Sequence, residues 1–188
     1  MIRTDSPTGM ELKSPADIAA RIIILSYLCY ASIEQDDAPV AVEFLISHHL
    51  WDQCSPTEKE FFQKSLSAEE KTLISWRLES IWMMMWIINL VDDPGLPVNE
   101  IQIDEVLTRI PAFMEDPETF IQLATIRDPA EIVEVRDMVT QLHSVVRQKI
   151  VGQSKPGELN PAVLAERNHA LEWVTYKLME WDAVDTHG

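Results

Sequence analysis

The sequence predicts an all-α protein, a single compact domain of several helices around a central apolar helix at about residues 68–91. Three observations support this fold class: helix-start signals recur along the chain, apolar residues repeat at helical spacing, and no stretch has a convincing strand pattern. Val98, Ile101 and Ile103 are the best candidates for an extended segment, but an isolated strand has nothing with which to pair.

Helix starts are marked by prolines that follow a short polar residue. Proline suits the first helical position because its missing N–H and fixed φ cost nothing there, and the preceding side chain can cap the free N–H groups. Five pairs have this pattern: Ser14-Pro15, Ser55-Pro56, Asp116-Pro117, Asp128-Pro129 and Asn160-Pro161. Three starts carry a capping-box carboxylate three residues after the cap: Ser55 with Glu58, Ser67 with Glu70, and Asp128 with Glu131.

In chain order, these signals predict helices at 15–33, 39–50, 56–65, 68–91, 104–110, 117–126, 129–151 and 161–180. The first contains an apolar run at 22–31, which we interpret as core because acidic rather than basic residues precede it. The fourth carries IWMMMWII at 81–88, which has no polar side and predicts burial on all sides, whereas the helix at 129–151 has one apolar face. Residues 92–102 and 152–159 are expected loops. Residues 1–13 are expected to form a flexible arm before a single domain at 14–188.

Length and charge restrict the function. The chain has 188 residues, the size of one domain, and 46% of them are apolar, enough for a sizeable core. Its net charge of −16 repels phosphate backbones and anionic lipid, so we expect neither nucleic-acid nor membrane binding. Cys29 and Cys54 form no disulfide or zinc pattern. With no basic leader or full-length apolar span, a soluble cytoplasmic protein is expected.

No motif dictates a reaction. Neither Gly-x-Ser-x-Gly nor a phosphate-binding glycine loop occurs. Glu166-x-x-His169 has the spacing of a di-iron ligand pair, but no other histidine has a Glu three residues before it. We interpret the adjacent His48 and His49 as solvated residues at a helix end. The sequence therefore predicts no catalytic residue, no metal and no cofactor, and it favours a protein that is not an enzyme.

Two charged residues, Arg77 and Glu79, lie at the entry to the most apolar part of the chain. Two positions apart on a helix, they point in different directions and cannot pair with each other. Because an unpaired buried charge is costly, each is expected to pair with a residue of another helix. The candidate partners are Asp137, His143, Arg147, Glu166, Arg167 and His169. These residues form either a structural network or a polar cleft, and the sequence leaves both open.

Three blocks of residues are specific as a set: SWR-x-E at 75–79 followed by Trp86, ER-x-x-AL-x-W at 166–173, and WD-x-V-x-T at 181–186. In order and spacing they resemble the domain-of-unknown-function 4272 family over about residues 14–187. The resemblance implies a compact helical protein of bacterial type and no particular activity. It selects Arg77, Glu79, His143, Arg147, Glu166, Arg167 and Asp182. Gln141 and Ser144 stand where the family usually has Arg and Trp, which argues against a catalytic box around His143.

The segment from Asp92 to Asp128 is strongly acidic. Nine acids stand against Arg109 and Arg127, a local net charge of −7. Its candidate partner-binding residues are Asp92, Asp93, Glu100, Asp104, Glu105 and Glu118, and the residues expected to hold it on the core are Ile103, Val106, Ile110 and Phe120. A surface of one sign steers a basic partner towards it, whereas the simpler interpretation is that it keeps the protein soluble.

Two functions of different classes follow. We prefer a non-enzymatic acidic interaction protein, of inhibitor or immunity type, whose partner is a basic protein. The alternative is a small-ligand binder or an enzyme that uses an inter-helix cleft of Arg77, Glu79, His143, Glu166 and Arg167, with arginine as an anion clamp and Glu79 or His143 as a base. The first is preferred because no nucleophile, metal set or cofactor loop supports chemistry.

Overall fold

The computed structural model describes residues 11–153, 155 and 157–184, and within this part of the chain it contains helices but no β-strand. The α-helices are α1 (Pro15–Ile33), α2 (Ala38–Ser47), α3 (Pro56–Gln63), α4 (Ala68–Ser75), α5 (Arg77–Ile87), α6 (Ile103–Leu107), α7 (Glu118–Gln122), α8 (Pro129–Val151) and α9 (Pro161–Thr175). Three short 3-10 helices are η1 (Gln35–Asp37), η2 (Trp51–Gln53) and η3 (Trp181–Ala183). The all-α fold class is confirmed.

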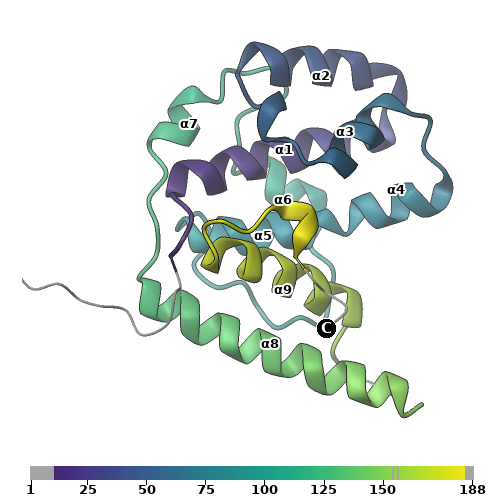
Figure 1. The fold of residues 1–188 in the computed structure, drawn as a ribbon, viewed down its shortest axis with the longest axis vertical. Helices are drawn as coiled ribbons and strands as arrows, with labels where there is room; N and C mark the ends of the chain where they lie inside the picture. The colour runs from purple at the N-terminus through teal and green to yellow at the C-terminus, as the bar shows by residue number, and fades with distance from the viewer. Residues whose placement is uncertain (1–10, 154, 156, 185–188) are drawn as a thin grey trace, which may run out of the picture.

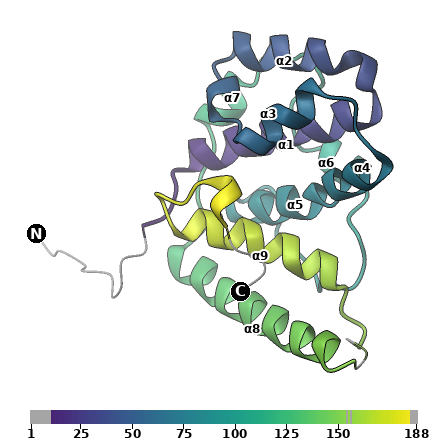
Figure 2. The same ribbon diagram turned by 45° about the vertical axis from the view of Figure 1, so that its right-hand side comes forward.

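The helices stack in layers (Figures 1 and 2). α2 and α3 lie over α1, α1 packs on α4 and α5, α9 packs on α5, and α8 covers α9. The short helices α6 and α7 pack on α5 and α1 respectively. The core therefore lies between α1, α5 and α9, and the chain between α5 and α8 is held against the outside of this stack.

The predicted central helix at 68–91 is not continuous, because the chain breaks at Trp76 into α4 and α5. The Glu79 N–H bonds to the Trp76 carbonyl at 3.0 Å, an i to i+3 bond that starts a new helix. In α4 only Ile74 is buried, whereas every residue from 79 to 87 is buried. The break thus separates an exposed amphipathic helix from the true central helix, α5, in which Trp86 is only 2% exposed.

α1 is the second core helix. An 18-residue window of it has a mean hydropathy of 1.5, so by length and composition it could cross a membrane. However, 72% of that window is buried inside the protein, against α2, α3, α4, α5 and α7. This burial is that of a core helix, as the sequence predicts for residues 22–31.

The cap predictions are confirmed at two of the three proposed capping boxes. Ser55 and Ser67 each accept the N–H of a glutamate that in turn accepts the N–H of the serine. The predicted box at Asp128 is wrong. Its side chain caps α8 through the Ala130 N–H at 2.9 Å, while Glu131 instead pairs with Arg127 at 3.0 Å.

The two ends of the described chain meet. The predicted helix at 161–180 ends at Thr175, and the following residues fold back over the core into η3. Lys13 anchors the N-terminal side, with its N–H on the Val174 carbonyl at 2.9 Å and its Nζ on the carbonyls of Lys177 (2.7 Å) and Met179 (2.9 Å). Residues 11–13 of the expected arm are therefore docked, and residues 1–10 lie outside the described residues.

Candidate functional site

The first pair predicted for the polar network lies between α5 and α9. Both carboxylate oxygens of Glu166 are 3.1 Å from Arg77 Nη1, and Glu166 also accepts the Ser80 hydroxyl at 2.7 Å. Arg77 and Glu166 side chains are 17% and 12% exposed. The predicted pairing of Arg77 across helices is confirmed, and the hydroxyl satisfies the carboxylate further.

The second pair, Glu79 with Arg167, is deeper. Arg167 Nε is 3.1 Å from Glu79 Oε2, and each side chain is 2% exposed. Burial raises the pKa of Glu79, and the Ile101 N–H and the Arg167 guanidinium oppose that shift. Arg167 also donates to the Gly95 carbonyl at 2.7 Å. In each pair the arginine thus contacts the carboxylate across the α5–α9 interface, as a structural network requires, and the Glu79–Arg167 pair is fully buried whereas Arg77–Glu166 is partly buried.

The other predicted network residues lie at different places. Asp137 is exposed and pairs with its neighbour Arg136 at 2.6 Å, while His143 is buried on α8. Arg147 lines a shallow hollow at the end of α8. Asp182 accepts the Thr57 N–H at 3.0 Å, and its pKa is lowered because hydrogen bonds from residues 55 and 57 outweigh the effect of burial.

A third charged centre lies around Trp181, and of its members the polar network predicted from the sequence contains only His169, as a candidate partner of Arg77 or Glu79. Arg21 pairs with Glu58 at 2.7 Å, and its guanidinium carbon lies 5.2 Å from the Trp181 ring. The His169 ring lies 4.3 Å from the same indole, and burial lowers the pKa of His169 to about 3. Within the described chain, three buried nitrogens here have no hydrogen-bond partner: Arg21 Nε, His169 Nε2 and Trp181 Nε1. The sequence also offers Glu58 as a capping residue of α3, but it does not show that Glu58 pairs with Arg21 as well.

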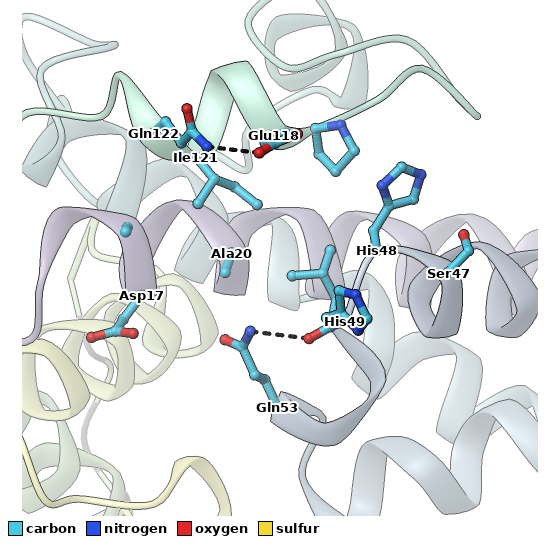
Figure 3. Close-up of a pocket in the computed structure, with 12 residues that line it drawn as sticks. Asp17, Ala20, Ser47, His48, His49, Gln53, Glu118, Ile121 and Gln122 are labelled. Carbon is cyan, nitrogen blue, oxygen red and sulfur yellow. Dashed lines mark hydrogen bonds between the residues drawn. The ribbon is translucent and has the colours of Figure 1, made fainter.

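A surface pocket of about 550 Å³ is lined by a different set of residues (Figure 3). We call it the corner pocket, because it lies where the α2–η2 turn meets α1 and α7. Its lining residues are Ala16, Asp17, Ala20, Ser47, His48, His49, Leu50, Gln53, Pro117, Glu118, Ile121 and Gln122. Its mixture of apolar wall and a few polar groups is typical of binding sites.

The corner pocket exists because small residues of α1 meet a sharp turn. Ala16 and Ala20 are four positions apart, on one face of α1, and leave space that longer side chains would fill. Two residues after the end of α2, His49 lies in the left-handed region (φ 58°), and the Leu50 N–H bonds back to the Leu45 carbonyl at 2.8 Å. Glycine is the usual residue in the left-handed position after a helix, so the sharp turn at His49 is not apparent from the sequence.

The acidic segment, residues 92–128, is exposed at every one of its nine acids. Arg127, one of its two bases, is turned inward: its Nε and Nη2 donate to the carbonyls of Trp86 (3.0 Å) and Val91 (2.9 Å). The segment also exposes large apolar side chains: Leu96, Ile103, Leu107, Phe113, Met114 and Leu123. Val106 is buried and Ile110 and Phe120 pack on the core, whereas Ile103 is 36% exposed and anchors less than expected.

The corner pocket and the acidic segment are continuous. Four pocket residues, Pro117, Glu118, Ile121 and Gln122, belong to the segment and form the α7 wall. Asp116, next to this wall, lies with its Oδ1 3.7 Å from His48 Nδ1. The sequence reasoning found Glu118 but missed the rest of the pocket, because its walls come from three segments far apart in the chain.

Nucleophilic chemistry finds no support in the cysteines. Burial raises the pKa of both Cys29 and Cys54 to about 12, so these thiols stay protonated and unreactive near neutral pH. In the residues that the structure describes, no group of three His, Cys, Asp or Glu side chains is placed to hold a metal ion. The corner pocket presents carboxylates, amides and apolar surface, which are groups that can contact a ligand.

Comparison with known proteins identifies the family. The family model Domain of unknown function (DUF4272) matches residues 1–184. Neither curated proteins nor solved structures gave a match. The matched region includes both α5–α9 ion pairs, the Trp181 centre and the corner pocket. The chain therefore belongs to the DUF4272 family.

Proposed function

We propose that this protein is a non-enzymatic interaction protein that acts in the bacterial cytoplasm, and that its acidic segment docks a basic protein. The observation that carries the proposal is the combination of nine exposed acids with exposed apolar side chains in one segment. If the segment exposed only acidic residues, keeping the protein soluble would be a sufficient explanation. Leucines that are 76% (Leu96) and 74% (Leu123) exposed oppose solubility and are typical of an interface.

The electrostatics favour a basic partner. The segment has a net charge of −7, and Arg127 directs its guanidinium to backbone carbonyls and to Glu131, so its charge is partly withdrawn from the surface. A field of one sign raises the association rate of an oppositely charged protein. An inhibitor or immunity-type protein is the finer form of this proposal, in which the basic partner is itself an active protein that docking blocks.

The alternative, chemistry in a cleft of Arg77, Glu79, His143, Glu166 and Arg167, has less support. Four of these side chains form two pairs between α5 and α9, and within each pair the charged groups contact each other at 3.1 Å. A clamp for an anion needs an arginine that is free to bind it. The corner pocket and the acidic segment are lined by other residues, so binding at the surface does not require these pairs to open.

The test compares two charge-reversed variants of the full chain. The segment variant changes Asp92, Glu100 and Asp104 to Lys, because these carboxylates cap no backbone group, whereas Glu105 caps α6 and is left intact. The control variant changes Glu43, Glu69 and Glu134, three exposed acids on α2, α4 and α8. Both variants move the net charge from −16 to −10, so they differ only in where the charge changes.

Each protein is immobilised and used to capture partners from a lysate of the source cell. The wild type and the control variant are expected to capture the same basic protein, and the segment variant to capture at least ten-fold less of it. Unfolding by urea should give similar midpoints for the three proteins, because exposed substitutions shift stability by only about ±0.5 kcal/mol each. Equal capture by the two variants, or capture of acidic proteins only, would contradict the proposal.

A further inference from the structure

A second pocket, of about 330 Å³, lies at the break between α4 and α5, and we call it the elbow pocket. Lys71 and Ser75 line it from α4, and they lie on one face of that helix because they are four positions apart. Leu78, the second residue of α5, lines it from beyond the break at Trp76. The pocket therefore depends on the same break that divides the helix predicted at 68–91.

The remaining walls of the elbow pocket come from the end of α1 and from α6. Cys29, Ser32 and Ile33 belong to α1, and Ile103 is the first residue of α6. Cys29 and Ser32 are short, buried side chains, and they leave space that a leucine would fill. Ile33 is 63% exposed and Ile103 is 36% exposed. A ligand with an apolar body would remove these two side chains from water, which is favourable.

The polar side chains of the elbow pocket leave one free hydrogen-bond donor. The Cys29 thiol and the hydroxyls of Ser32 and Ser75 each donate to a backbone carbonyl, at 3.5, 2.7 and 2.7 Å respectively. The serine oxygens keep lone pairs but have no hydrogen left to donate. Lys71 Nζ makes no hydrogen bond or ion pair with any residue that the structure describes. A ligand group that satisfies the pocket is therefore an acceptor.

The charge of this free donor is positive and is not neutralised by a neighbour. None of the described residues that line the pocket is acidic, in a chain with 31 acidic residues. Glu70, next to Lys71 in α4, contacts Lys64 at 2.7 Å and accepts the Ser67 N–H at 2.8 Å, so its carboxylate is engaged elsewhere. An ammonium group beside apolar walls is complementary to a carboxylate on an apolar body. A phosphate carries more charge than one lysine neutralises, in a protein whose net charge is already −16.

We propose that the elbow pocket binds a small carboxylate with an apolar chain of about six to ten carbon atoms. The chain lies against Ile33, Leu78 and Ile103, and the carboxylate accepts from Lys71 Nζ. The chain length follows from the volume, because an apolar cavity of about 150 Å³ holds benzene and this pocket is about twice as large. The inference goes beyond the proposed function and does not depend on it, because the pocket shares only Ile103 with the acidic segment.

The probe is sodium octanoate, titrated below its micelle-forming concentration into the full-length ¹⁵N-labelled protein at neutral pH. Three control compounds separate the head from the chain: 1-octanol has the chain with a neutral head, octylamine has a positive head, and acetate has the carboxylate without the chain. We expect octanoate to shift amides of residues 29–33, 71–78 and 103. Octanol should bind at least ten-fold more weakly because it offers Lys71 no charge, and octylamine and acetate should give no localised shifts.

Two variants, each with a matched control, test the geometry. Lys71→Met removes the charge and keeps an unbranched stem, so it should weaken octanoate binding at least ten-fold and leave octanol binding unchanged. Lys149→Met, at an exposed lysine of α8, also moves the net charge from −16 to −17 and should bind octanoate as the wild type does. Ser75→Leu fills the pocket and should abolish the shifts with both compounds. Thr72→Leu, at an exposed position of the same helix that does not line the pocket, should retain them.

An unchanged amide spectrum outside the pocket shows that each variant is folded. Equal affinities for octanoate and octanol, or octanoate binding that survives Lys71→Met, would overturn the inference. Octanoate shifts that are absent or centred on another part of the protein would overturn it as well. Octyl phosphate tests the class of anion: it should bind more weakly than octanoate, and tighter binding would show that the pocket does not select a carboxylate.

Discussion

Glu79 and Arg167 form an ion pair across the α5–α9 interface, with Arg167 Nε 3.1 Å from Glu79 Oε2 and both side chains 2% exposed. The second oxygen of Glu79 accepts the Ile101 N–H at 2.7 Å, and Arg167 Nη1 donates to the Gly95 carbonyl at 2.7 Å. This one buried pair therefore joins two core helices to two points of the loop at 92–102, Gly95 and Ile101. That loop carries the first three acids of the acidic segment, so a core interaction positions the proposed docking surface.

Breaking this pair should destabilise the protein strongly. Arg167→Met leaves Glu79 buried without its counter-ion and should lower the unfolding free energy by about 3–5 kcal/mol. Arg167→Met with Glu79→Leu should cost less than the two single changes together, because no isolated charge remains. Urea unfolding of the four proteins gives the coupling energy of this mutant cycle.

The control for that cycle is the surface pair Lys64–Glu60, whose side chains are 34% and 64% exposed and whose Lys64 also contacts Glu70 at 2.7 Å. Removing Glu60, which leaves Lys64 paired with Glu70, should change stability by no more than about 1 kcal/mol. Additive effects at Glu79 and Arg167, or a cost as small as at the exposed pair, would show that the buried pair does not hold α9 on α5.

Trp86 should be the most costly single truncation in α5. It is 2% exposed, and the Arg127 guanidinium carbon lies 4.8 Å from its ring. Trp86→Ala should lower the unfolding free energy by about 3–5 kcal/mol, enough to threaten a domain of ordinary stability. Leu123→Ala, at a side chain that is 74% exposed, is the matched apolar truncation and should change it by no more than about 0.5 kcal/mol. Similar values for the two would contradict the central position of α5.

His169 should make stability fall on acidification. Burial first, and then the charge of Arg77, lower its pKa to about 3, against 6.5 for the ordinary group. Between pH 6.5 and pH 3, His169 is therefore protonated in the unfolded chain but remains neutral in the folded protein. The stabilisation that is present above pH 6.5 is lost as the pH falls towards 3. His169→Gln should remove this contribution. Its stability deficit relative to wild type, measured by urea unfolding, should shrink by about 2 kcal/mol between pH 6.5 and pH 5. A deficit that is constant with pH would show that His169 is not held neutral.

The fold was predictable from local signals. Ser14, Ser55 and Asn160 mark helix starts that the structure has at the expected residues, since proline and capping side chains act within one turn. The helix ends were harder. α9 ends at Thr175 rather than at residue 180, because the following residues bond back to Glu11 and Lys13, contacts that no local pattern contains.

The candidate site was predictable only in part. The rule that two charges at i and i+2 cannot pair was enough to predict that Arg77 and Glu79 pair with residues of other helices. It did not choose between the candidates on α8 and those on α9, and the structure places both partners, Glu166 and Arg167, on α9. Arg21 was missed because it lies within an apolar helix, and its partner Glu58 had already been explained as a cap. The corner pocket could not be predicted, because its concavity depends on how two alanines of α1 face the α2–η2 turn and α7.

The central claim is that the acidic segment steers a basic partner to the protein, and the most direct measurement is the association rate constant as a function of salt. The association rate constant of the partner captured by the wild type is measured on three immobilised proteins in turn: the wild type, the segment variant and the control variant. Each measurement is made at about 20 mM and at about 500 mM salt. Screening shortens the range of the field to a few ångströms at high salt, so steering should disappear there. We expect the wild type and control to associate at least ten-fold faster than the segment variant at low salt, and all three to converge at high salt. Association rates that are equal for the three proteins at low salt would contradict the claim and leave the segment as a solubility surface.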